Sequence, residues 1–193
     1  MFSSLKIRKG FSLIEMLLVL GVLAVLLIAA FVVYPRVKLS QQIHQEKANI
    51  FAIQTGIRSA LLSQGGSFET LGFVENPTGN AFANRARIVP SNMNGGDYSG
   101  SEILNGWGGR VVVHSTVGSF GGYARGRTFG IQYNEIPKEA CVQFVTETIG
   151  NFVAVWVNGS TGAGTYLTPK SSVEKIVERC EVQPVATVHF VSD

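Results

Sequence analysis

A run of 23 mostly apolar residues, from Phe11 to Val33, constrains this chain more than any other feature of its sequence. It is long enough to cross a bilayer as a helix, which takes about 20 residues. Glu15 is its only charged residue. A buried acid costs about 2.5–3.5 kcal/mol at the centre of such a helix, while each Leu, Ile, Val or Phe returns about 0.3–0.6 kcal/mol. We therefore predict a membrane helix with a functional carboxylate, because a charge in hydrocarbon needs a partner.

Three basic residues, Lys6, Arg8 and Lys9, stand directly before the apolar run. Such residues stay on the cytoplasmic side, so the rest of the chain is expected to face outward. A cleaved secretory signal has an apolar core of about 7–15 residues and a small-residue cleavage site. The run here is longer, and residues 34–38 offer no such site. A plain signal anchor is the alternative, but it leaves Glu15 without a role.

The stretch Gly10-Phe11-Ser12-Leu13-Ile14-Glu15 behind a basic leader resembles the processing site of type IV prepilins. The resemblance implies that residues 1–10 are a leader, that a prepilin peptidase cleaves after Gly10, and that Phe11 is then N-methylated. It also implies that Glu15 neutralises the new terminal amine of a neighbouring subunit. The chemistry is consistent, because a buried charge is tolerated when it is paired and costs several kcal/mol when its partner is removed.

Helical periodicity continues beyond the apolar run. We predict one long helix, with a transmembrane or fibre-core part over residues 11–34 and an amphipathic continuation over 35–64. Pro35 is a candidate kink, since proline removes a backbone donor. The pair Gly65-Gly66 should end the helix. The apolar positions expected to face the outer domain are Ile43, Ile50, Ile53, Ile57, Ala60 and Leu61.

Residues 65–193 are predicted to form one globular α+β domain. Turn signals dominate residues 65–106, where 71–75 and 85–89 fit either a short helix or a strand. Strands are expected at 110–114 and 127–133 as a hairpin, at 152–157, and at 184–191. A helix should begin at Pro137 and end at Gly150. A short helix or turn is expected at 172–180, with Val173, Ile176 and Val177 facing inward.

The chain has two cysteines, Cys141 and Cys180. In an exported domain an even number of cysteines predicts a disulfide. Closing a loop of about 40 residues is worth roughly 3–5 kcal/mol in the chain-entropy model. The alternative is a pair of buried free thiols. The sequence has no CxxC motif and no cluster of His and Cys, so we expect neither metal nor cofactor. His44, His114 and His189 are scattered and are expected to be surface or packing residues.

Charge and motif content exclude several classes of function. The net charge is +3, and the leader itself carries three positive charges, so the mature chain would be neutral. A nucleic-acid partner is therefore not expected, because it requires a basic surface. We find no nucleophile elbow, zinc-protease motif or phosphate loop, and we expect no enzyme. The glycine-rich stretch 121–127 could hold an anion, but such stretches are usually turns.

The outer domain narrows the resemblance to type IVb pilins. Asn105-Gly106-Trp107-Gly108-Gly109 before a strand is similar to their Asn-Pro-Phe/Trp-Gly-Gly element, and Glu139-Ala140-Cys141-Val142 to their cysteine-bearing helix. The residues from Val173 to Cys180 resemble their final disulfide-bounded region. The family includes toxin-coregulated pilin, bundle-forming pilin and the thin-pilus pilins of conjugative plasmids.

The resemblance implies the pilin fold, a long N-terminal helix packed on an antiparallel sheet with short helices. It also implies that the region between the cysteines, residues 141–180, is exposed on the fibre. Within that region we expect 159–164 and Lys170 at the surface, and Phe144, Phe152 and Trp156 in the core.

Two features depart from the type IVb pattern. Phe11 and the ten-residue leader look more like type IVa pilins. Val32 stands at the type IVa kink position, where that subclass has proline, and Pro35 follows three residues later. The N-terminal segment thus has features of both subclasses, while the elements of the outer domain, which follow one another in the same order as in type IVb pilins, favour type IVb.

The expected function is that of a major pilin, with other copies of the chain, a prepilin peptidase and inner-membrane assembly machinery as partners. The chain would cross the inner membrane once before assembly and then join an extracellular fibre for adhesion, aggregation or conjugative contact. The alternatives are a minor pilin, a type II secretion pseudopilin, or, in another class, a membrane-anchored glycan-binding adhesin.

Overall fold

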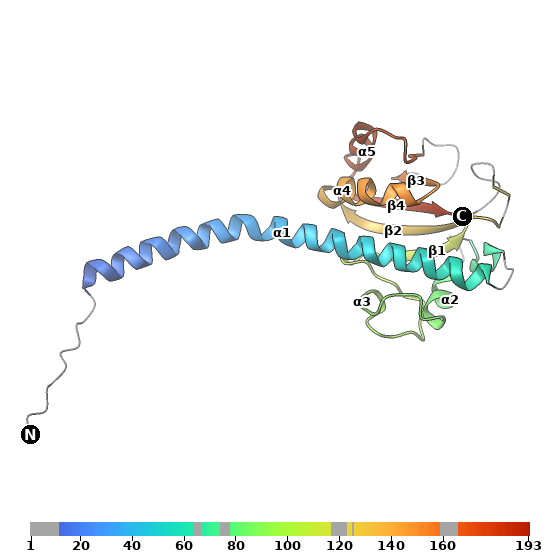
Figure 1. Ribbon diagram of the computed structural model, residues 1–193, viewed down its shortest axis with the longest axis horizontal. Coiled ribbons are helices and arrows are strands. Elements are labelled where there is room, and N and C mark those ends of the chain that lie inside the picture. Colours follow the sequence, from blue (N-terminus) through green and yellow to red (C-terminus); the bar gives the residue numbers. More distant parts are fainter. Residues whose placement is uncertain (1–11, 64–66, 74–77, 117–122, 125, 159–165) are drawn as a thin grey trace, which may run out of the picture. The chain divides into compact units, whose positions relative to one another are not determined.

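The structure is a computed structural model that describes residues 12–63, 67–73, 78–116, 123–124, 126–158 and 166–193 (Figure 1). The chain divides into two compact units, Met1–Ser40 and Gln41–Asp193. Helix α1 (Leu13–Leu62) contributes its first part to one unit and its second part to the other.

Helix α1 confirms the predicted long helix and ends one residue before Ser63. Pro35 lies inside it, and the helix continues through this residue although proline donates no backbone hydrogen bond. In the second unit, Ile43, Ile50, Ile53 and Ile57 are fully buried, which confirms the predicted apolar stripe. Ala60 is only half-buried.

The domain is built on a four-stranded antiparallel sheet of β1 (Val111–Ser115), β2 (Phe129–Pro137), β3 (Ala154–Val157) and β4 (Val185–Ser192). The strand order is β1-β2-β4-β3, so the last strand of the chain lies between β2 and β3. The predicted hairpin is confirmed, because β1 pairs with β2 in antiparallel register. Strand β3 begins two residues later than expected and pairs with β4.

Three short helical elements follow β2 and β3. They are α4 (Lys138–Thr148), the 3₁₀ helix η2 (Ile149–Asn151) and α5 (Val173–Cys180). Pro137 is not in the first turn of α4 as predicted, because it is the last residue of β2 and the N-cap of α4.

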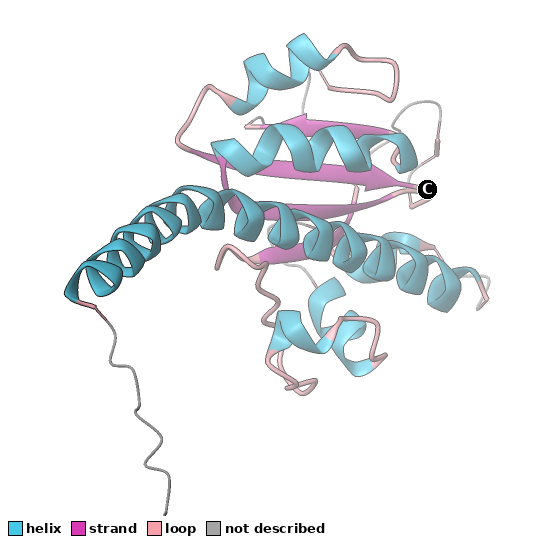
Figure 2. Ribbon diagram, turned by 60° about the vertical axis from the view of Figure 1, so that its left-hand side comes forward, coloured by secondary structure: helices cyan, strands magenta, loops and turns pink. Residues whose placement is uncertain are grey.

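One face of the sheet is covered by helices. Figure 2 shows α4 and the second part of α1 lying across it. The ring of Phe144 on α4 packs 5.4 Å from Tyr133 and 5.5 Å from Phe190, measured between ring centroids. Tyr133 and Phe190 belong to β2 and β4, so these aromatic rings join α4 to the centre of the sheet.

The segment before β1 contains η1 (Phe68–Leu71), α2 (Gly79–Arg85) and α3 (Ser91–Asn94). Of residues 85–89, for which helix or strand remained open, Arg85 is the last residue of α2 and 86–89 form neither. Asn80 donates to the carbonyl of Val111 at 2.8 Å and accepts from the N–H of Val113 at 2.7 Å. It thereby satisfies backbone groups of β1, an edge strand that would otherwise invite another strand to pair.

Candidate functional site

The first unit presents an apolar helix with no covering. None of its described side chains, from Ser12 to Ser40, is buried. The only charged side chain in the apolar part is Glu15, in the first turn of α1 and also exposed. Within the described residues, α1 is the one helix long and apolar enough to span a membrane, judged by length and composition. The predicted processing residues Gly10 and Phe11 lie outside the described residues.

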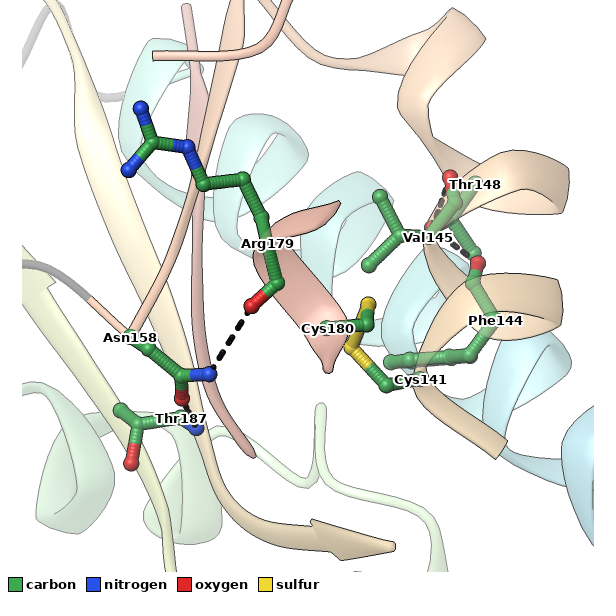
Figure 3. The surroundings of a disulfide bond; sticks show 8 residues. All are labelled: Cys141, Phe144, Val145, Thr148, Asn158, Arg179, Cys180 and Thr187. Carbon is green, nitrogen blue, oxygen red and sulfur yellow. Dashed lines mark hydrogen bonds between the residues drawn. A yellow bond between two sulfur atoms is a disulfide. The ribbon is translucent and has the colours of Figure 1, made fainter. Parts of the chain in front are cut away.

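The two cysteines form a disulfide between α4 and α5 (Figure 3). Their Cα atoms are 5.8 Å apart, and both residues are fully buried. The predicted Cys141–Cys180 bond is therefore present, and the alternative of two free thiols is wrong. It ties α5 to α4, which itself packs on the sheet through Phe144.

Asn158 supports the same region from the end of β3, as Figure 3 shows. Its Nδ2 donates to the carbonyl of Arg179 at 3.1 Å, and its Oδ1 accepts from the N–H of Thr187 at 2.9 Å. Its backbone has a φ of 53°, in the left-handed region that asparagine tolerates better than most residues. One side chain thus links β3, β4 and the end of α5.

The region between the cysteines is only partly exposed. All four residues of β3 are buried, and Phe144, Phe152 and Trp156 lie in the core as expected. Lys170 is exposed as predicted, whereas 159–164 lies outside the described residues.

The prediction that Val173 faces inward is wrong, because its side chain is 55% exposed. Ile176 and Cys180 share the buried face of α5, and the disulfide holds that face against α4. Val173 is the first residue of α5 and lies farthest along the helix from this bond.

The loop Asn105–Gly109 is bound to α1 by polar side chains. Glu46 Oε1 accepts hydrogen bonds from the N–H of Gly106 at 2.9 Å and from Asn49 Nδ2 at 3.0 Å. Gln42 donates to the carbonyl of Gly106 at 3.3 Å. The loop is closed by Asn105, whose Oδ1 accepts from the backbone N–H groups of residues 107 and 109. Residues 105–109, which resemble the Asn-Pro-Phe/Trp-Gly-Gly element of type IVb pilins, thus form a loop that is hydrogen-bonded to α1.

Glu46 is an acidic residue on the buried face of α1, and it is only 1% exposed, which is unusual for a carboxylate. Burial raises the pKa of its carboxyl, and the hydrogen bonds from Gly106 and Asn49 oppose that rise. The neighbouring Tyr133 hydroxyl is fully buried, and burial followed by the charge of Glu46 raises the pKa of this phenol well above its usual value. The Tyr133 hydroxyl also acts as a hydrogen-bond donor to this carboxyl, which further opposes the rise in the pKa of Glu46.

A second polar contact joins α1 to α4. Lys47 Nζ lies 3.2 Å from Glu147 Oε2, and Gln143 Nε2 donates to Glu147 Oε1 at 2.8 Å. The Gln143 hydrogen bond, followed by the bond and charge of Lys47, lowers the pKa of Glu147. His44 lies 3.8 Å from the same carboxylate, and its side chain is 63% exposed.

The other two histidines are not scattered in space. His114 on β1 is 2% exposed and His189 on β4 is 8% exposed, and their ring centroids are 6.2 Å apart. No group of three or more His, Cys, Asp and Glu in the described part of the chain is arranged to hold a metal ion. Residues 121, 122 and 125 of the stretch 121–127 lie outside the described residues, so its anion-binding interpretation is untested.

Comparison with known proteins shows the family to which the chain belongs. The family model described as PilS N terminal matches residues 40–193, and the model described as Prokaryotic N-terminal methylation motif matches residues 5–31. No match was found among curated proteins.

Two solved structures resemble the chain. TcpA, a type IV pilin from Vibrio cholerae El Tor biotype, is 17% identical with a TM-score of 0.51, over 79% of this chain and 99% of TcpA. The type IV b pilin from Salmonella typhi is 20% identical with a TM-score of 0.49, over 74% of this chain and 96% of that pilin. The likeness to TcpA supports a pilin fold.

The fold consists of a helix with an exposed apolar half and an antiparallel sheet domain, and it is the fold of a pilin. The chain belongs to the PilS N terminal family, carries the N-terminal methylation motif and is a pilin, a subunit of a pilus. The resemblance on which the sequence interpretation rested is therefore confirmed.

Proposed function

We propose that this chain is a major pilin that is cleaved after Gly10, methylated at Phe11 and polymerised through Glu15. The observation that carries the proposal is the position of Glu15, the one acid in the apolar first part of α1. All described side chains between Leu13 and Leu20 are exposed there. An exposed apolar helix needs lipid or other helices around it. A carboxylate on such a helix needs a cation.

Cleavage after Gly10 supplies that cation. It frees the amine of Phe11, which is positively charged and lies at the start of the apolar run. A copy of the chain that enters the fibre brings both groups, and the Glu15 carboxylate of one copy pairs with the Phe11 ammonium of the next. Pairing is favoured at one axial stagger only, because any other leaves two charges unpaired in an apolar core.

The same features support the partners and the location that we propose. A prepilin peptidase removes residues 1–10, and inner-membrane pilus assembly machinery extracts the mature chain. Before assembly the chain crosses the inner membrane once with its N-terminus in the cytoplasm, because its basic residues precede the apolar run. After assembly it forms an extracellular fibre for adhesion, aggregation or conjugative contact.

The experiment compares Glu15→Ala and Glu15→Gln with Ser12→Ala, a nearby control that keeps the carboxylate. Both Glu15 variants should be processed normally, because the cleavage site is intact. Their yield of sheared fibres should fall at least about tenfold, since an unpaired buried charge costs several kcal/mol and 1.4 kcal/mol is a factor of ten. Wild-type fibre yield from Glu15→Ala would refute the pairing.

A further inference from the structure

The face of the sheet that carries the two buried histidines holds a group of polar side chains that the pilin function does not use. His114 on β1 is opposite Gly130 on β2, and Gln132 on β2 is opposite His189 on β4. Gly130 and Gln132 are two residues apart and therefore point to the same face. His114, Gln132 and His189 thus gather on three neighbouring strands around a residue that has no side chain.

The ring of His114 extends over β2. A Cβ atom placed on Gly130 would lie 2.4 Å from Cε1 and 2.5 Å from Nε2 of this ring. Nδ1 lies 2.9 Å from the carbonyl oxygen of Ser115. A carbonyl only accepts, so in the neutral ring Nδ1 carries the proton and Nε2 carries a lone pair. Nε2 is buried and has no hydrogen-bond partner among the described residues.

Gln132 also presents an acceptor. Asn134 Nδ2 donates to the carbonyl of Arg110 at 2.7 Å, so the oxygen Oδ1 is the atom of Asn134 that faces Gln132. Gln132 Nε2 donates to that oxygen at 2.7 Å. The amide oxygen Oε1 of Gln132 is therefore left over, and it is buried without a partner in the described part of the chain.

His189 completes the group. Its Nδ1 is the third buried atom of this face that lacks a hydrogen-bond partner within the described ranges. The ring centroids of His114 and His189 are 6.2 Å apart. With metal–nitrogen bonds of about 2.0–2.1 Å, two imidazoles on one ion have centroids about 5–6.5 Å apart. The observed 6.2 Å lies at the wide end of this range, so a shared ion would hold the two rings at a wide angle to each other.

We propose that His114 Nε2, His189 Nδ1 and Gln132 Oε1 form a binding site for one first-row transition-metal ion, Zn²⁺ or Cu²⁺. Buried polar atoms that lack a hydrogen-bond partner are unfavourable, and a cation bound by all three would satisfy them at once. Imidazole nitrogen is a ligand for zinc and copper, whereas Mg²⁺ and Ca²⁺ prefer carboxylate and carbonyl oxygens. The bond from His114 Nδ1 to a backbone carbonyl is the support that metal-binding histidines usually have.

Both imidazoles are available as ligands at neutral pH. Burial lowers the pKa of His114, and burial together with the charge of His114 lowers the pKa of His189 to about 4. Metal ligands must be deprotonated, so these rings need to lose no proton before they bind.

The site is tested by metal binding to the full-length, tag-free protein in detergent. ZnCl₂ or CuCl₂ is added, with MgCl₂ as the control for a hard cation. We expect one Zn²⁺ or Cu²⁺ per chain after dialysis. The melting temperature should rise by about 5–10 °C at a hundredfold excess over the dissociation constant. EDTA should reverse the rise, and Mg²⁺ should produce none.

Matched histidine variants locate the ion. His114→Gln and His189→Gln should each lose the bound metal, whereas His44→Gln removes the exposed third histidine and should retain it. Copper bound at the site should also quench Trp156, which is opposite His189 on β3. Absence of Zn²⁺ and Cu²⁺ from the wild type, or retention of the metal by the His114→Gln/His189→Gln variant, would overturn the site.

If a histidine variant does not fold, a second measurement on the wild-type protein tests the site. Nitrogen-15 spectra of the imidazoles report each ring separately. Zn²⁺ should shift the resonances of His114 and His189 and leave those of His44 unchanged. A shift confined to His44 would show that the ion binds at the surface and would refute the site.

Discussion

The carboxylate of Glu46 and the backbone N–H of Gly106 are joined by a hydrogen bond of 2.9 Å across 60 residues of sequence. The bond is partly buried and connects α1 to the loop before β1. It places an acid in the core beside the buried hydroxyl of Tyr133. Glu46 therefore serves as an acceptor for the loop, and its charge is a cost, as its raised pKa indicates.

Two substitutions separate the acceptor from the charge. Glu46→Ala removes the acceptor that the Gly106 N–H shares with the buried amide of Asn49, and it should lower the free energy of unfolding by about 1–3 kcal/mol. Glu46→Gln keeps the amide oxygen in place of Oε1 and should remain within about 1 kcal/mol of the wild type. Urea unfolding at pH 7 measures both, with Thr55→Ala as the control for an exposed position on α1. Equal losses in Glu46→Ala and Glu46→Gln would contradict the role of acceptor.

Gly130 is required by its contact with His114. In Gly130→Ala the new methyl group would lie within 2.5 Å of the buried ring, so we expect a loss of about 1–3 kcal/mol from overpacking. Gly150→Ala is the matched control, because a Cβ atom there meets nothing within 4 Å. Adding His114→Ala should recover part of the loss, as thermal unfolding of the double variant would show. Strict additivity of the two changes would mean that the ring is not the obstacle.

The disulfide should stabilise the domain. Cys141 and Cys180 are separated by 39 residues, and the Cys141→Ser/Cys180→Ser variant should unfold with about 2–4 kcal/mol less free energy than the wild type. Dithiothreitol should lower the wild-type melting temperature toward that of the variant and leave the variant unchanged. An unaltered wild-type melting temperature under full reduction would be the opposite result.

The histidine pair predicts a loss of stability in acid. Both folded-state pKa values lie below the ordinary value of 6.5, and that of His189 is about 4. A depressed pKa contributes stability above the unfolded value that is lost as the pH falls toward the folded one. His189 should therefore cost about 3 kcal/mol between pH 6.5 and 4 in the presence of EDTA.

Burial is the main cause that lowers the pKa of both rings. The charge of His114 lowers the pKa of His189 further, whereas the hydrogen bond to the Ser115 carbonyl raises that of His114. Unfolding of His189→Gln should accordingly depend less steeply on pH over this range than unfolding of the wild type. His44→Gln should retain the wild-type slope, because His44 is exposed. Parallel curves for all three proteins would exclude the buried pair as the source.

Periodic features of the sequence predicted the elements well. The isoleucine stripe on α1, the β1–β2 hairpin and the disulfide all follow from short-range patterns or from pairing two cysteines. The insertion of β4 between β2 and β3 is a long-range choice that no local pattern encodes. The prediction for Val173 was wrong because this residue, although spaced like Ile176 and Cys180, begins α5 at the end farthest from the disulfide.

The burial and the contacts of polar residues were the features that the sequence interpretation missed most. Glu46 looked like one of the polar residues between the apolar positions of α1, and its partner Gly106 is 60 residues away. His114 and His189 are 75 positions apart in sequence and meet only because β2 lies between their strands. The signal available in advance was the glycine at 106 and at 130, where a close approach of another residue leaves no space for a side chain.

Mass spectrometry of sheared surface fibres tests the central claim most directly. We expect this chain to be the most abundant protein, to begin at Phe11 and to carry one methyl group on that amine. In cells that make only Gly10→Ala, the chain should keep its leader and no fibres should form. A chain recovered intact from Met1, or one that never enters fibres, would contradict the account.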